Sequence, residues 1–214
     1  MIRIPIQPRR VVGDPGYHSE PPLRPQEVDA EIHVMLDIET LANRPGAAIV
    51  ELAAQAFAFV PALGEIRQVG FQGFERAILP HEALWADIDT LRWHEKKGQW
   101  KGPNGIYMAQ AFEEFGLWAR DLQAELCDVA TWWSWGATFD FPVLDYAWLV
   151  SGIRNGRPWK YWEIECARTV WRRAFGPDVR RPERSHRAAD DVAAAIGDLG
   201  KALAALHRPT PPAP

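Results

Sequence analysis

The spacing of apolar residues predicts three amphipathic helices. Apolar side chains recur every three or four positions, the period that places them on one face of a helix. The pattern is clear over residues 112–122, 141–148 and 192–206. Each of these helices can therefore cover a sheet with one face.

Other segments predict strands. Residues 32–36 form a short apolar run that ends at Asp37, as expected for a buried strand with a carboxylate at its edge. Residues 129–135 are β-branched and aromatic, which favours a later strand. Residues 47–60 and 66–79 also have strand character, although the alanine-rich first segment is compatible with some helix. Strands followed by mixed strands and helices predict an α/β sheet with helices against its faces.

The two ends of the chain lack this periodicity. Residues 1–30 are rich in proline and charge and predict an extended N-terminal arm, and residues 208–214 predict a flexible proline-rich tail. The segment 31–207 then forms the folded domain. A chain of 214 residues with 47% hydrophobic content suffices for one well-buried core and is short for two.

Charge and composition narrow the function. The formal net charge of −4 argues against binding nucleic acid by a basic surface alone. Cys127 and Cys166 are too few for a disulfide framework or a cysteine-built zinc site, and this favours a reducing cytoplasm. No stretch approaches the ~18 apolar residues of a membrane span, so we expect no membrane contact. Most of the eleven tryptophans are expected to pack in the core, although tryptophan also stacks on bases.

Two positions early in the domain have the geometry of a cation site. Asp37 and Glu39 are two apart, so on an extended strand both side chains project to one face. Such a pair is also common on solvated strand faces. Asp140 lies where a predicted strand breaks at Gly136 and a helix begins, so it is either a helix N-cap or a metal ligand.

A second polar cluster precedes the last helix. His186, Asp190 and Asp191 fit an ordinary surface helix start, because aspartate is favoured there. On a continuous helix, His186 and Asp191 would point about 140° apart. If both act in one site, His186 must therefore lie in the preceding loop. Nearby arginines form either a solvated surface or a local positive field: Arg172, Arg173, Arg180, Arg181, Arg184 and Arg187.

Together these side chains fit the hydrolysis of phosphodiesters by two metal ions. Two cations ~3.5 to 4 Å apart require several carboxylates from different elements, one of which bridges both ions. A histidine, which ordinarily titrates near pH ~6.5, can deprotonate the attacking water. Oxygen ligands without cysteine favour Mg²⁺ or Mn²⁺ over zinc.

The motifs resemble those of a known enzyme family. Asp37 to Thr40, Thr138 to Asp140, and His186 followed by Asp191 resemble the three motifs of the DEDDh 3′-5′ exonucleases, over roughly residues 32–205. More narrowly, residues 37–57, 132–144 and 159–169 are similar to phage and prophage exonucleases related to a mycobacterial 3′-5′ exoribonuclease.

The resemblance implies a ribonuclease H-like α/β fold, with a mixed five-stranded sheet flanked by helices. Asp37 would bridge both metals, Glu39 and Asp191 would bind the metal that holds the nucleophilic water, Asp140 would place the second metal through water, and His186 would be the general base. The backbone at Thr40 and Leu41 would lie against the terminal nucleotide, with Leu41 beside its base. Further candidates for substrate contact are Phe139 and Arg187.

The predicted function is a two-metal 3′-5′ exonuclease that releases nucleoside 5′-monophosphates from the 3′ end of single-stranded DNA or RNA. One alternative is a non-catalytic module on the same fold that binds nucleic acid or a partner protein. Another is an endonuclease or integrase acting on internal phosphates. The sequence leaves open the choice between DNA and RNA and the oligomeric state, a homodimer included.

Overall fold

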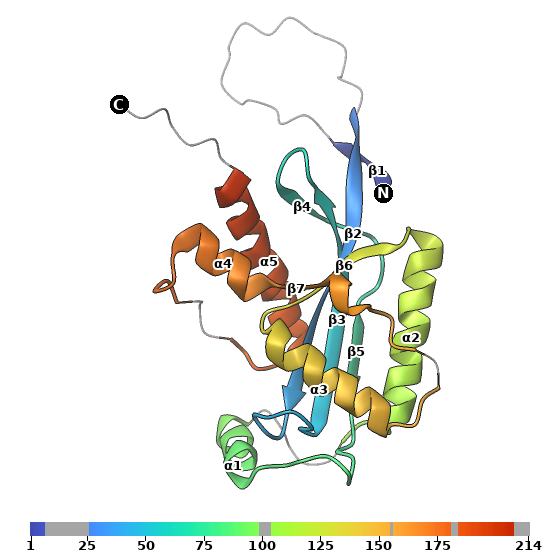
Figure 1. Cartoon of the computed structure of the whole chain (residues 1–214), viewed down its shortest axis with the longest axis vertical. Helices are drawn as coiled ribbons and strands as arrows, with labels where there is room; N and C mark the ends of the chain where they lie inside the picture. The colour runs from blue at the N-terminus through green and yellow to red at the C-terminus, as the bar shows by residue number, and fades with distance from the viewer. Residues whose placement is uncertain (7–25, 99–103, 155, 181–183, 208–214) are drawn as a thin grey trace, which may run out of the picture.

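The computed structural model describes residues 1–6, 26–98, 104–154, 156–180 and 184–207 (Figure 1). Its strands are β1 (Ile2–Ile6), β2 (Gln26–Thr40), β3 (Ile49–Val60), β4 (Glu65–Gln68), β5 (Phe74–Ala77), β6 (Val129–Ser134) and β7 (Ile164–Cys166). Its α-helices are α1 (Ile88–Lys97), α2 (Met108–Glu125), α3 (Ala137–Val150), α4 (Ala167–Phe175) and α5 (Ala188–His207). A short 3₁₀ turn, η1 (Tyr161–Glu163), precedes β7.

The strands form one mixed sheet. Five of them follow the order β4-β3-β2-β6-β7, while β5 pairs with β3 and β1 pairs with β2. β3 is antiparallel to β2, whereas β6 is parallel to β2 and β7 is parallel to β6. This confirms the predicted α/β class, and the two short strands β1 and β5 bring the sheet to seven.

The alternation of side chains along β2 divides the core in two. Ile32, Val34, Leu36 and Ile38 belong to the larger cluster, which also contains the buried apolar residues of α2 and α3. Met35 faces the other way, into a smaller cluster that contains residues of α4 and α5. Figure 1 shows the corresponding arrangement, with α4 and α5 on one side of the sheet and α2 on the other. Asp37 and Glu39 continue the Met35 face and therefore point toward the α5 side.

The predicted helices agree with α2, α3 and α5, and the late strand agrees with β6. β2 is longer than expected, because it continues past Asp37 to Thr40. β3 is wholly strand despite its alanines, since they pack in the middle of the sheet. The single strand expected over residues 66–79 divides into β4 and β5 around the glycines Gly70 and Gly73.

The pattern missed the short elements β1, β7, α1 and α4. Residues 2–6 pair with residues 26–30, so both ends of the expected arm are strands. Residues 7–25 and the expected tail, 208–214, lie outside the described residues. Within the described ranges, no helix has the length and apolar content that crossing a bilayer would require.

Candidate active site

The end of β2 supplies two of the predicted carboxylates. In the antiparallel pairing with β3, Asp37 lies opposite Ala53 and Glu39 lies opposite Glu51. Side chains opposite one another in such a pair share a face of the sheet. The small Ala53 therefore leaves room beside Asp37, and Glu51 adds a carboxylate next to Glu39.

The start of α5 supplies the next two groups. Asp191 is buried in the first turn of α5, where its Oδ1 accepts hydrogen bonds from the Ser185 N–H (3.1 Å) and hydroxyl (3.0 Å). His186 lies in the loop before α5, with a left-handed backbone (φ 56°) that is uncommon outside glycine. His186 thus precedes the helix, which is the placement that the sequence analysis required for it to act together with Asp191. Ligand atoms of Glu39, His186 and Asp191 all lie within 4.8 Å of one another.

The first turn of α3 supplies Asp140. The helix begins at Ala137 with Gly136 as its N-cap, so Asp140 is not itself the cap. Its Oδ2 instead accepts a hydrogen bond from the Gly136 N–H at 3.2 Å, which fixes the carboxylate beside the end of β6. Asp140 is 7% exposed. A predicted ligand thus lies on each of three elements: β2, α3 and α5.

The electrostatics show that these carboxylates share one region. Burial raises the pKa of Asp37 well above its ordinary range, and the charges of Asp140, Glu39 and Asp191 raise it further. Burial also raises the pKa of Glu39 to about 8, with Asp191, Glu51 and Asp140 adding to the shift. The pKa of Asp140 rises to about 6 through burial, against the opposing effects of Ser134, Gly136 and Arg168.

The donor set fits divalent cations. Buried carboxylates that repel one another are costly unless they are protonated or matched by positive charge. Arg184 lowers the pKa of Asp37, but its guanidinium is already paired with the buried Asp198. Oxygen ligands with a single imidazole and no thiolate suit Mg²⁺ or Mn²⁺. Asp37, Glu39, Asp140 and Asp191 are the residues that would hold the ions.

Glu51 is a site residue that the sequence did not reveal. Its Oε2 accepts a hydrogen bond from the Ala188 N–H at 3.1 Å, and its Oε1 lies 3.3 Å from Arg187 Nε. A carboxylate at the first N–H groups of a helix accepts hydrogen bonds from unpaired donors and interacts favourably with the positive end of the helix dipole. Glu51 therefore ties β3 to the start of α5, next to the His186 loop. No local motif marks this role, since it arises from pairing between strands.

Helix α1 is a further part of the site that the sequence analysis missed. Its Trp93 meets the His186 ring edge to face, with centroids 4.7 Å apart. The neighbouring His94 is buried and its Nε2 lies 3.0 Å from the Thr40 carbonyl oxygen. α1 thus links the end of β2 to the His186 loop.

The residues predicted to contact substrate differ in their accessibility. Leu41 is 1% exposed, its N–H donates to the Ala48 carbonyl, and its own carbonyl accepts from Asp87, so a base could reach Leu41 only if these neighbours moved. Thr40 is also buried and its hydroxyl donates to the Ala42 carbonyl. Phe139 is half-buried, and Arg187 is exposed but paired with Glu51 and Glu75.

A comparison with families of known proteins identifies the family of the chain. Residues 32–203 match the 3′-5′ exoribonuclease Rv2179c-like domain. The chain belongs to this family. The description of this family agrees with the predicted enzyme class, a 3′-5′ exonuclease. The similarity to phage and prophage enzymes stays a prediction. A comparison with curated protein sequences finds no match.

Solved structures show the same fold in other nucleases. A 3′-exonuclease described in 3′-end specific recognition of histone mRNA stem-loop has a TM-score of 0.55 at 11% identity, over 83% of this family member and 65% of that chain. Cell-death related nuclease 4 (CRN-4) has a TM-score of 0.53 at 14% identity, over 80% of this family member and 63% of CRN-4. The nuclease domain of 3′hExo, a DEDDh family member bound to rAMP, has a TM-score of 0.50 at 11% identity, over 81% of this family member and 92% of that domain. This family member thus spans less than two thirds of CRN-4 and of the histone mRNA exonuclease.

A surface hollow elsewhere in the domain is separate from this site. It lies between α2 and α3 and is lined by residues that include Phe112, Gly116 and Trp148. It shares no residue with the carboxylate cluster, so we place the chemistry at the carboxylates.

Proposed function

We propose that the chain is a two-metal-dependent exonuclease that removes nucleoside 5′-monophosphates from the 3′ end of single-stranded nucleic acid. The observation that supports this most is the convergence of Glu39, His186 and Asp191 within 4.8 Å, beside the partly buried Asp37 and the buried Asp140. RNA is the substrate that we propose first, because the description of the family names an exoribonuclease.

We assign to each side chain the role that the resemblance to the DEDDh exonucleases implies. Asp37 lies in the field of the other three carboxylates, and together with Glu39, Asp140 and Asp191 it would hold two cations. Bound there, the cations would supply neutralising charge for the scissile phosphate and make water a better nucleophile. His186, in the loop before α5, accepts the proton from the attacking water. Trp93 holds the His186 ring by its edge-to-face contact.

The test is product analysis on matched oligonucleotides. Single-stranded RNA and DNA carrying a 5′ label are incubated with Mg²⁺ or Mn²⁺, with free and with blocked 3′ ends. We expect stepwise shortening from a free 3′ end, release of nucleoside 5′-monophosphates, and protection by the block. His186→Ala should lower the rate by about 10²- to 10⁴-fold, the usual contribution of a general base.

The same experiment separates the alternatives. Circular single strands should resist the enzyme, and their cleavage would identify an endonuclease instead. Intact strands in every condition, with wild-type protein and Asp37→Asn behaving alike, would indicate a binding module without turnover.

A further inference from the structure

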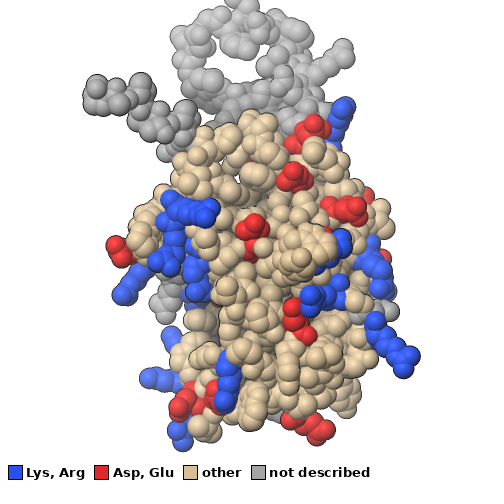
Figure 2. All heavy atoms as spheres, in the orientation of Figure 1, with Lys and Arg blue, Asp and Glu red and all other residues tan. Residues whose placement is uncertain are grey.

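Helix α4 presents a row of arginines to solvent. Arg168, Arg172 and Arg173 are exposed, while Ala167 and Trp171 on the other side of the helix are buried. α4 packs against α5, so its orientation relative to the carboxylate cluster is fixed. Figure 2 shows Lys and Arg side chains gathered over this part of the surface.

Among the described residues, none of these three guanidinium groups forms a salt bridge, although Arg168 lies near Asp140 and its charge acts on that carboxylate. Nearby arginines differ, because Arg184 pairs with Asp198 and Arg187 pairs with Glu51. In a chain of net charge −4, positive charge left unneutralised on one helix creates a local attraction for anions.

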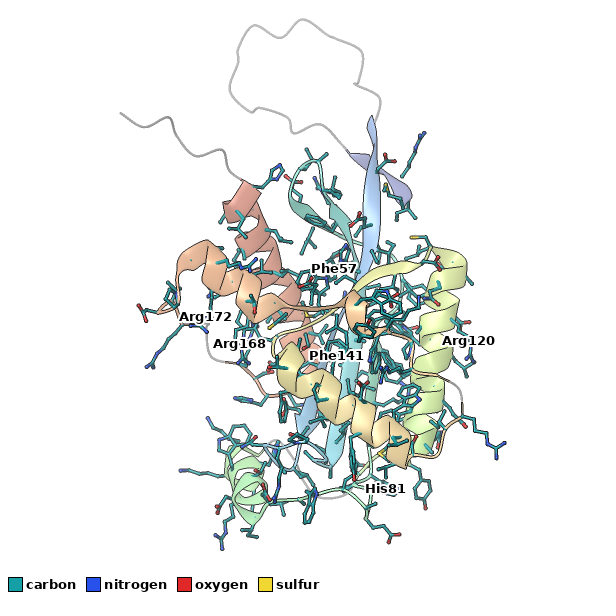
Figure 3. The ribbon with its side chains drawn as sticks, viewed as in Figure 1. Phe57, His81, Arg120, Phe141, Arg168 and Arg172 are labelled. Atoms are coloured by element: carbon teal, nitrogen blue, oxygen red, sulfur yellow. The ribbon has the colours of Figure 1, made fainter. Side chains whose placement is uncertain are left out.

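The row begins next to the carboxylate cluster. The Arg168 Nη2 lies 2.9 Å from the position that a Cβ on Gly136 would occupy, and Asp140 Oδ2 lies 3.6 Å from the same point. Glycine at position 136 therefore leaves space for the Arg168 guanidinium beside the first turn of α3. In Figure 3, Arg168 lies between α4 and the start of α3, and Arg172 lies farther out along α4.

The spacing of the row suits a nucleic acid backbone. Arg168 and Arg172 are four residues apart on one face of a helix, so their Cα atoms are separated by about 6 Å along the axis. This is comparable to the separation of neighbouring phosphates in an extended strand. Guanidinium groups bind phosphate oxygens through two parallel hydrogen bonds and carry no information on base sequence.

We propose that Arg168, Arg172 and Arg173 form a phosphate-binding row that holds the single strand upstream of its 3′ end. This inference rests on the proposed function, because it assumes that the terminal phosphodiester lies at the carboxylate cluster. Arg168 contacts the phosphate nearest the cluster, and Arg172 and Arg173 contact the phosphates that follow. The row supplies, in one place, the positive charge that the surface as a whole lacks.

The test measures binding separately from turnover. A fluorescent single strand of about ten nucleotides is titrated with the full chain in EDTA, and anisotropy is read at several salt concentrations. The double variant Arg168→Ala/Arg172→Ala should bind about tenfold more weakly, and the salt slope should fall by about 0.7 for each phosphate that the variant no longer binds. Arg120→Ala is the matched control. Arg120 is exposed on α2, on the opposite side of the molecule from α4 in Figure 3, and its replacement should change neither value.

A comparison of substrate lengths adds a second readout. With Mn²⁺, the double variant should lose more kcat/KM on the long strand than on a dinucleotide, because only the long strand reaches Arg172. Equal losses on both would overturn the proposal.

Three other outcomes also test the phosphate-binding row. Unchanged strand affinity in the double variant, or no measurable strand binding by the wild-type protein, would refute the row. Loss of binding to vesicles that contain phosphatidylserine, with strand binding intact, would assign the arginines to a membrane surface instead. Strand binding that depends on the row in a protein without nuclease activity would leave the row standing and refute the proposed function.

Discussion

The two faces of β2 differ in how they affect the stability of the fold. Ile32, Val34, Leu36 and Ile38 are apolar, at most 6% exposed, and surrounded by other apolar side chains. On the other face, apolar packing at Met35 gives way to Asp37 and Glu39, whose burial raises both pKa values. One face therefore stabilises the fold, while the end of the other face costs stability until positive charge arrives. Substitutions at adjacent positions of one strand should separate these two roles.

The largest expected effect is on turnover at the polar face. Asp37→Asn keeps the size of the side chain but removes the charge that would bridge two cations. We expect the rate of strand degradation to fall by about 10³-fold or more. Thermal unfolding without metal at pH ~8 should show a melting temperature equal to or above that of the wild type, because the substitution removes the cost of holding a carboxyl group among three other carboxylates. A destabilised Asp37→Asn protein would contradict this reading of the face.

The neighbouring position should give the reverse result. Leu36 is 0% exposed in the larger core, and Leu36→Ala leaves a cavity there. We expect the free energy of unfolding to fall by about 2–5 kcal/mol in denaturant titrations. Activity per folded molecule should remain close to wild type at low temperature, since no ligand is removed. A loss of activity as large as that of Asp37→Asn, in protein shown to be folded, would mean that the two faces are not separable.

The sequence predicted these two faces unequally. Alternation along residues 32–36 predicted the buried strand, and the spacing of Asp37 and Glu39 predicted their common face. Helical periodicity found α2, α3 and α5, because each buries a long apolar stripe. It missed α1, in which His94 is the buried residue, and α4, which is short and rich in arginine. Periodicity reports burial, and neither helix buries a long stripe.

The contacts that complete the site are not encoded locally. Glu51 faces Glu39 because β2 and β3 pair in one register, and it reaches Ala188 because α5 crosses that face. Arg168 approaches Asp140 because Gly136 leaves space between α3 and α4. Each of these positions depends on two elements far apart in the chain. The motif residues could be found from spacing, whereas their supporting residues required the fold.

A medium effect is expected at Glu51, which lies on the polar face but is not among the predicted ligands. Glu51→Leu removes the acceptor for the Ala188 N–H and the partner of Arg187, so the His186 loop loses its anchor. We expect kcat/KM to fall by about 10- to 100-fold, as for other residues that orient ligands. Glu51→Gln keeps an oxygen acceptor for Ala188 and should recover most of the activity. Equal losses in both variants would show that the charge of Glu51 matters more than its hydrogen bond.

The smallest effect concerns the pH dependence of stability without metal. In the folded protein the pKa of Glu39 is about 8 and that of Asp140 about 6, both above their ordinary values. Between pH ~4 and ~8 the folded state therefore binds more protons at these groups than the unfolded chain does, and their contribution to stability is lost as pH rises. Glu39→Gln removes one such group, so its unfolding free energy should fall less steeply with pH than that of the wild type, by at least about 1–2 kcal/mol over this range.

The measurement is thermal unfolding in EDTA from pH ~5 to ~8.5, where this difference corresponds to roughly 2–8 °C in melting temperature. Adding Mn²⁺ at the upper end should raise the melting temperature of the wild type more than that of Glu39→Gln, because the ion supplies the charge that the ionised carboxylates lack. Parallel pH profiles for the two proteins would show that Glu39 ionises in the folded state at no cost. In that case the polar face of β2 would need no cation to stabilise it. The two faces would then differ in their effect on turnover and not in their effect on stability.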